Sequence, residues 1–176
     1  MRKAPIGVFA RNGFNSTKVS DIVAEAGLSQ PSFYLYFESK EATYESLVEE
    51  FREDLRRVTL SNLIDPYTTQ EALEAQVAIS FRTFHHFMAA DRALTEIGFF
   101  QPPGCSIAKQ QMVGWVASNH REEQSNGIFR PGVAADEMAR VLVGMIDQFA
   151  RIDANAERTR LAGVCAKMFF SGAFVL

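Results

Sequence analysis

The chain has 176 residues and a net charge of −3, with 47% hydrophobic and 22% charged residues, which is typical of a soluble globular protein of one or two domains. No apolar run reaches the roughly 18–20 residues that cross a bilayer, and no long apolar stretch lies near Met1. We therefore expect neither a membrane span nor a signal peptide, and a cytoplasmic location. Cys105 and Cys165 are far apart and fit no metal-ligand pattern, so we expect reduced thiols and no metal or cofactor.

Three short helices are predicted at the start of the chain, over about residues 4–12, 18–26 and 30–37. In the first two, apolar residues recur at helical spacing and a glycine follows the last turn. Thr17 and Ser29 precede the second and third helices, where a hydroxyl side chain can cap the first turn.

Longer helices follow, and no apolar/polar alternation indicates a strand. Ser39 is the predicted N-cap of the first of them. The segment 64–69 is predicted to be a linker, because it contains Pro and Thr and lacks periodicity. The expected longer helices span about residues 40–62, 70–89, 106–124, 134–153 and 154–171, with a shorter one after Asp91. The fold class is therefore all-α.

The second and third helices have the spacing of a helix-turn-helix. They are joined through Ala26-Gly27-Leu28-Ser29, where a small residue allows close approach and glycine allows a sharp turn. In such a motif the second helix lies in the DNA major groove with its N-terminal residues against base edges. We expect a DNA-binding domain over residues 1–47 and a helical ligand-binding and dimerisation domain over residues 48–176.

Residues around the third helix have side chains suited to DNA. Gln30 can pair with adenine, Pro31 can contact a thymine methyl, and hydroxyls or ammonium groups can reach phosphates. Phe33 and Phe37, four residues apart, are expected in the core. The candidate DNA-binding residues are Thr17, Lys18, Ser29, Gln30, Pro31, Ser32, Tyr34, Tyr36 and Lys40.

Several segments resemble the N-terminal signature of the TetR family of repressors, in order and without gaps over about 45 residues. They are Phe9–Phe14, Thr17–Ile22, Ala24–Ser29, Phe33–Phe37 and Ser39–Glu41. The resemblance implies a homodimer whose two DNA-binding domains read a palindromic operator, and a small-molecule effector bound in the helical body of each subunit.

Two further sets of residues are predicted in the body. A pocket rich in phenylalanine favours an apolar or aromatic effector. Two apolar helix faces near the end of the chain need a partner surface, for which the resemblance implies the second subunit. The candidate pocket residues are Phe81, Phe84, His85, Met88, Phe99, Met112, Trp115 and Phe149, and the candidate dimer residues are Val141, Met145, Phe149, Leu161, Val164 and Met168.

The sequence leaves two other classes of function to compare with this one. The first is a helical ligand-binding or interaction protein that has lost specific DNA binding. Two observations support it: residues 1–47 hold five basic and five acidic residues, and only a short arm precedes the first helix. The second is an enzyme, which we do not expect because the sequence has no metal-protease motif, nucleophile elbow or phosphate-binding glycine loop.

Overall fold

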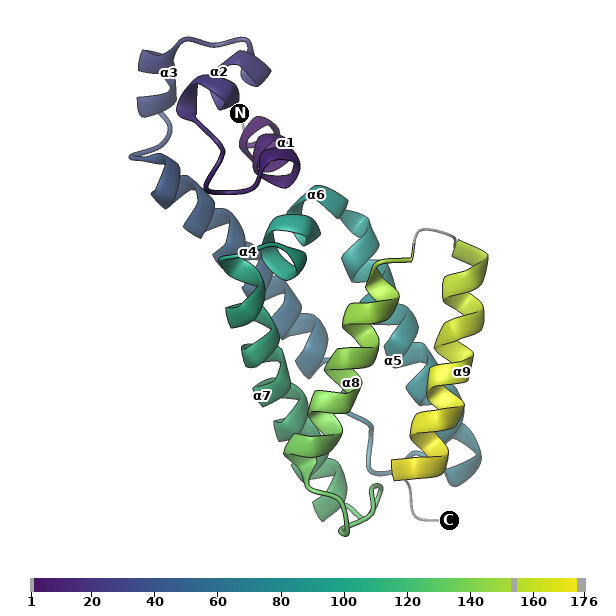
Figure 1. Cartoon of the computed structure of the whole chain (residues 1–176). Helices are drawn as coiled ribbons and strands as arrows, with labels where there is room; N and C mark the ends of the chain where they lie inside the picture. The colour runs from purple at the N-terminus through teal and green to yellow at the C-terminus, as the bar shows by residue number, and fades with distance from the viewer. Residues whose placement is uncertain (1, 153–154, 174–176) are drawn as a thin grey trace. The chain divides into compact units, whose positions relative to one another are not determined.

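The computed structural model describes residues 2–152 and 155–173, and within them the chain is helical. Figure 1 shows the helices in chain order. They are α1 (Lys3–Asn12), α2 (Val19–Ala26), α3 (Gln30–Tyr34), α4 (Lys40–Leu60), α5 (Gln70–Ala90), α6 (Arg92–Thr95), the π-helical turn η1 (Glu96–Phe100), α7 (Gly104–Ser125), α8 (Ala135–Ala150) and α9 (Asn155–Ala173). The predicted all-α class is confirmed.

The helix ends differ from the predictions by a few residues. Helix α2 begins at Val19 with Lys18 at the N-cap, so the predicted cap at Thr17 is wrong. Helix α3 ends at Tyr34 rather than near Phe37, and in the turn that follows it the amides of Tyr36 and Phe37 both donate to the Phe33 carbonyl. The predicted cap at Ser39 is confirmed, since its hydroxyl accepts from the Ala42 amide at 3.0 Å. The predicted boundary at residues 153–154 lies outside the described residues.

The chain divides into two compact units. The first comprises the residues up to Asp54 together with Asp91–Lys109, and the second comprises Leu55–Ala90 and the residues from Gln110 onward. The predicted functional division near residue 47 remains a prediction.

In the first unit, Tyr44 joins helix α4 to the segment that contains η1. Its buried hydroxyl donates to the Ile97 carbonyl at 3.1 Å and accepts from the Gly104 amide at 3.2 Å. Gly98 and Gly104 permit this approach: a Cβ on Gly98 would lie 2.5 Å from a ring carbon of Phe51, and one on Gly104 would lie 2.8 Å from the Ile97 carbonyl oxygen. The start of α4 is thus bonded to a segment that follows about fifty residues later in the chain.

In the second unit, α5 packs against α8 and α9, and Figure 1 shows these three helices side by side. The described residues contain no helix long and apolar enough to cross a membrane.

Candidate nucleic-acid interface and ligand pocket

Helices α2 and α3 form a helix-turn-helix. Gly27 ends α2 with φ 66° and ψ 32°, a left-handed conformation that favours glycine. The amide of Leu28 donates to the Val23 carbonyl at 2.8 Å and closes the turn. Ile22 from α2 and Phe33 from α3 are completely buried. The turn and this core together fix the direction of α3.

The outer face of α3 and the turn after it are open to solvent. Gln30 and Pro31, the first two residues of α3, are exposed. Tyr34 and Tyr36 are 60% and 65% exposed, and Leu35 between them is 83% exposed. The helical pattern did not mark Leu35, because a lone leucine between Phe33 and Phe37, which are buried and half-buried, resembles a core residue. Together these five residues form a mixed polar and apolar surface that can contact bases or phosphates.

Three more of the candidate DNA-binding residues are Ser29, Ser32 and Lys18. The hydroxyls of Ser29 and Ser32 lie 2.9 Å apart. Lys18 is exposed, and its backbone amide donates to the Asp21 carboxylate at 2.9 Å. The Lys18 ammonium makes no ion pair within the described parts of the chain, which leaves it available to a phosphate.

Thr17 and Lys40 are placed differently from the other candidates. Thr17 is 2% exposed, and both its hydroxyl and its amide donate to the Gly13 carbonyl, at 2.7 and 3.2 Å. The Lys40 ammonium donates to the carbonyls of Phe14 and Thr17, each at 3.1 Å, and lies 4.5 Å from the centre of the Phe14 ring. Both residues hold the α1–α2 connection in place, so their direct effect is on the shape of the DNA-binding region.

Two of the other basic side chains in the first unit are paired with carboxylates. Arg2 lies 2.5 Å from Glu50, and Arg11 lies 2.7 Å from Glu25. All four side chains are about half exposed, so each pair contributes little to stability and can exchange with phosphate oxygens.

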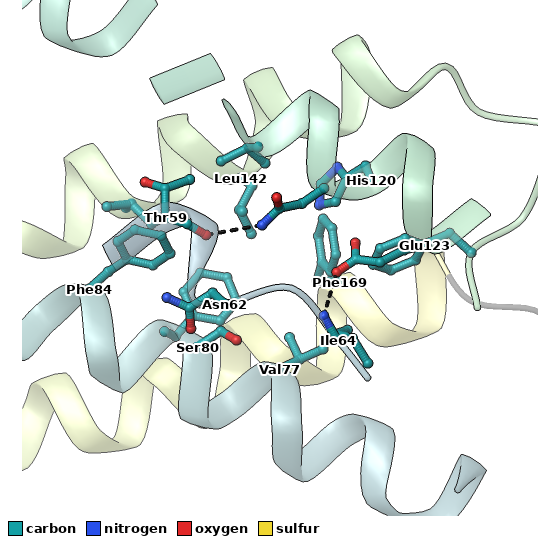
Figure 2. A pocket seen from close by; sticks show the side chains of 15 residues that line it. Thr59, Asn62, Ile64, Val77, Ser80, Phe84, His120, Glu123, Leu142 and Phe169 are labelled. Carbon is teal, nitrogen blue, oxygen red and sulfur yellow. Dashed lines mark hydrogen bonds between the residues drawn. The ribbon is translucent and has the colours of Figure 1, made fainter. Parts of the chain in front are cut away.

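The second unit contains an apolar pocket. Its cavity has a volume of about 50 Å³ and is partly open to solvent. Figure 2 shows the side chains that line it. They come from the end of α4 and the loop after it, from α5, α7, α8 and α9, and from the loop before α8. The lining residues are Thr59, Asn62, Ile64, Val77, Ser80, Phe81, Phe84, Val116, Asn119, His120, Glu123, Phe129, Leu142, Ile146 and Phe169.

Two ionisable side chains of α7 border the pocket. Glu123 accepts a hydrogen bond from the Ile64 amide at 2.9 Å, drawn as a dashed line in Figure 2. Burial raises the pKa of Glu123 to about 7, although this hydrogen bond lowers it. His120 packs against the rings of Phe129 and Phe169, with centroids 5.0 and 5.7 Å away. Burial lowers the pKa of His120 to about 4, so its imidazole is neutral near pH 7.

The pocket includes only part of the predicted set. Phe81 and Phe84 line it, whereas His85, Met88, Met112, Trp115 and Phe149 do not, and Phe99 belongs to the first unit. On α7 the pocket is lined by Val116, Asn119, His120 and Glu123, which begin one turn after Met112. The polar pair His120 and Glu123 was missed, although its spacing of three residues on one helix could have indicated a shared face.

The predicted dimer residues form an apolar surface on α8 and α9. Val141, Val164 and Met168 are 55%, 39% and 65% exposed. Met145, Phe149 and Leu161 are half-buried. A groove bounded by Val133, Glu137, Met138, Val141, Met145, Met168 and Phe169 runs along it. A surface of this kind favours association with another protein surface.

The chain combines a helix-turn-helix whose second helix is exposed with a helical unit that contains an apolar pocket. This combination is typical of helix-turn-helix transcriptional regulators. A family model for bacterial regulatory proteins of the tetR family matches residues 3–47. The chain is also 37% identical over 145 residues to the HTH-type transcriptional regulator YdgC of Bacillus subtilis, a match that covers 82% of this chain and 74% of YdgC. The chain belongs to the TetR family, whose members typically form homodimers and bind ligands.

Solved structures show the same fold. A TetR family regulator from Chloroflexus aurantiacus has a TM-score of 0.76 at 17% identity, and the match covers 99% of this chain and 91% of that one. The regulator FadR from Bacillus subtilis, solved in complex with stearoyl-CoA, has a TM-score of 0.68 at 19% identity, and the match covers 97% of this chain and 96% of that one.

Proposed function

We propose that the protein is a homodimeric repressor that binds a palindromic operator and is released from it by a small apolar or aromatic effector. The observation that carries the DNA-binding part is the exposed face of α3. Its side chains are not needed for the local core, which Phe33 supplies, and they can pair with base edges.

The proposed effector site is the apolar pocket in the second unit. Phenylalanines supply much of its wall and a few polar groups border it, as in most small-molecule sites. The cavity of about 50 Å³ is small, so a ligand of drug-like size requires the lining side chains to move apart. The complex of FadR with stearoyl-CoA is in keeping with an effector site in a fold of this type.

The proposed dimer surface is the apolar face of α8 and α9. A twofold dimer presents two DNA-binding domains to two half-sites about 34–36 Å apart, or a multiple of that distance. An effector that binds better to a state with a different separation lowers operator affinity by linkage.

The test is selection of genomic DNA fragments by the purified protein at about physiological salt, where binding to phosphates alone is weak. We expect enrichment of one palindrome, and weaker binding of the Q30A variant to it. A folded dimer that enriches no sequence would contradict the proposal.

One observation favours the alternative of a ligand-binding protein that no longer reads DNA. The ion pairs of Arg2 and Arg11 neutralise two of the basic groups that would otherwise attract DNA. The E25Q and E50Q variants distinguish the two functions. If the protein reads DNA, freeing these arginines strengthens its binding to the enriched palindrome. If it does not, no sequence is enriched and the variants bind all DNA fragments alike.

A further inference from the structure

Two buried polar atoms at the pocket have no hydrogen-bond partner among the described residues. They are Oε2 of Glu123 and Nδ1 of His120, on residues that are 2% and 4% exposed. The other carboxylate oxygen of Glu123 accepts from Ile64, and the other ring nitrogen of His120 is accounted for by a hydrogen bond with the Ala135 backbone. Since the two residues are three apart on α7, they border the pocket from one face of that helix.

Both unpaired atoms are acceptors above pH 7. An ionised carboxylate only accepts hydrogen bonds, and an imidazole that uses its Nε2 proton on Ala135 has a lone pair on Nδ1. The hydroxyls of Thr59 and Ser80, which also line the pocket, already donate to the carbonyls of Leu55 and Gln76. The side-chain amides of Asn62 and Asn119 also line the pocket, and each donates an N–H to a carbonyl, that of Val58 at 2.7 Å and that of Thr59 at 3.0 Å. Among the described residues, the buried lining atoms that lack a partner are therefore both acceptors.

The charge of the lining disfavours one type of ligand. Among the described residues that line the pocket there is no lysine or arginine to balance an anionic head group. Phe81, Phe84, Phe129 and Phe169 supply apolar surface for the rest of a ligand.

We infer that the pocket binds a molecule with an apolar body and a hydrogen-bond-donating head group, which donates to Oε2 of Glu123 and Nδ1 of His120. A hydroxyl or an amine has this chemistry, and a carboxylate does not. The inference rests on the proposed function in one respect, that this pocket is the effector site.

The experiment measures by calorimetry at pH 8 the affinity of the full-length protein for four probes with one body: biphenyl, 4-phenylphenol, 4-(aminomethyl)biphenyl and biphenyl-4-carboxylate. We expect the phenol, the amine or both to bind at least about tenfold more tightly than biphenyl and the carboxylate, since a donor satisfies atoms that are otherwise unpaired. The phenol and amine arms distinguish a neutral donor from an ammonium group.

The E123Q variant provides a reversal test. Its new side-chain carbonyl would keep the hydrogen bond from the Ile64 amide, which places the NH2 group where Oε2 of Glu123 now lies. We expect this variant to lose the preference for donors and to gain affinity for the carboxylate probe. The matched control is E71Q, because Glu71 is an exposed residue of the same unit whose charge is not among those that shift the pKa of Glu123, and its change should leave the wild-type order intact.

Equal affinity for all four probes would overturn the inference, because bound water would then satisfy the two acceptors. Absence of binding by every probe, or an unchanged order in a folded E123Q protein, would overturn it as well. If E123Q does not fold, the order of affinities of the four probes for the wild-type protein decides whether the inference holds. Operator selection uses no ligand, so failure of these assays and failure of DNA binding are separate results.

Discussion

The carboxylate of Glu123 holds the backbone amide of Ile64 at 2.9 Å, although the two residues are 59 positions apart in sequence. This bond ties the loop after α4 to helix α7 and leaves the second carboxylate oxygen at the pocket. The same side chain therefore contributes to the stability of the second unit and to the polarity of the proposed effector site.

The pH dependence of stability should change in the E123Q variant. The pKa of Glu123 in the folded protein, about 7, lies above its ordinary value of 4.5, so the folded state binds the extra proton between these values. This carboxyl therefore favours folding below pH 4.5 and loses that contribution as pH rises through 7. His120 acts in the opposite sense, because its pKa is lowered from 6.5 to about 4, and its contribution is lost as pH falls.

The two effects oppose each other between about pH 5 and 6.5 in the wild type. In E123Q the histidine remains alone, so thermal denaturation should show this variant losing stability relative to wild type as pH falls, by up to about 1.4 kcal/mol per pH unit. The variant E71Q, at an exposed glutamate that does not act on Glu123, should run parallel to wild type. If the stability of E123Q depended on pH in the same way as that of wild type, the raised pKa of Glu123 would be contradicted.

Lys40 and Lys18 should separate stability from DNA affinity. K40M keeps the aliphatic stem but removes two hydrogen bonds from a charged donor to backbone carbonyls, so we expect a loss of roughly 1.5–3 kcal/mol in unfolding free energy. K18A should leave stability unchanged and reduce the slope of log affinity against log salt by about one, as for one lost phosphate contact. Equal effects of the two variants on unfolding would contradict this division.

Gln30 should affect base preference more than general affinity. Because its side chain is exposed at the start of α3, Q30A should unfold within about 0.5 kcal/mol of wild type. Repeating the operator selection with Q30A should relax the preference at one position of each half-site, with a discrimination loss of about 1–3 kcal/mol. A uniform loss over all positions would show that Gln30 contacts only the DNA backbone.

Tyr44→Phe should destabilise the first unit without opening a cavity. The change removes one hydroxyl that satisfies both the Ile97 carbonyl and the Gly104 amide, which are buried with it. We expect a cost of about 1–3 kcal/mol in chemical denaturation. Tyr67→Phe is the control, since Tyr67 is 92% exposed; similar costs for both would show that the buried hydroxyl is dispensable.

Met168→Asp should separate the subunits of the proposed dimer. The residue is 65% exposed in the single chain, so a carboxylate there is tolerated by the monomer but is costly when a second surface covers it. Sedimentation velocity should show a folded monomer for this variant and a dimer for wild type. Tyr67→Asp is the matched control, and a dimeric M168D protein would place the interface elsewhere.

The helix-turn-helix was predictable because its determinants are local. The i, i+3, i+4 spacing around Ile22, the glycine at position 27 and the buried Phe33 lie within a short stretch of the chain. The pocket was less predictable, because apolar residues at helical spacing do not reveal which turn of α7 faces α5 and α9. Trp115 and His120 lie on one helix, yet only His120 lines the pocket. The role of Lys40 was also hidden, since a basic residue at a helix start equally suggests a phosphate contact.

The bonds that Tyr44 makes to Ile97 and Gly104 bear on how such regulators can be recombined. The chain enters the first compact unit twice, once before Asp54 and again between Asp91 and Lys109. A chimaera made by exchanging only the residues before Asp54 would place Tyr44 of one protein against the Asp91–Lys109 segment of another. To transfer DNA specificity between relatives, either both segments of the first unit must be exchanged, or the exchange must be confined to α2 and α3. The smaller exchange keeps the buried contacts between α2 and α3 together.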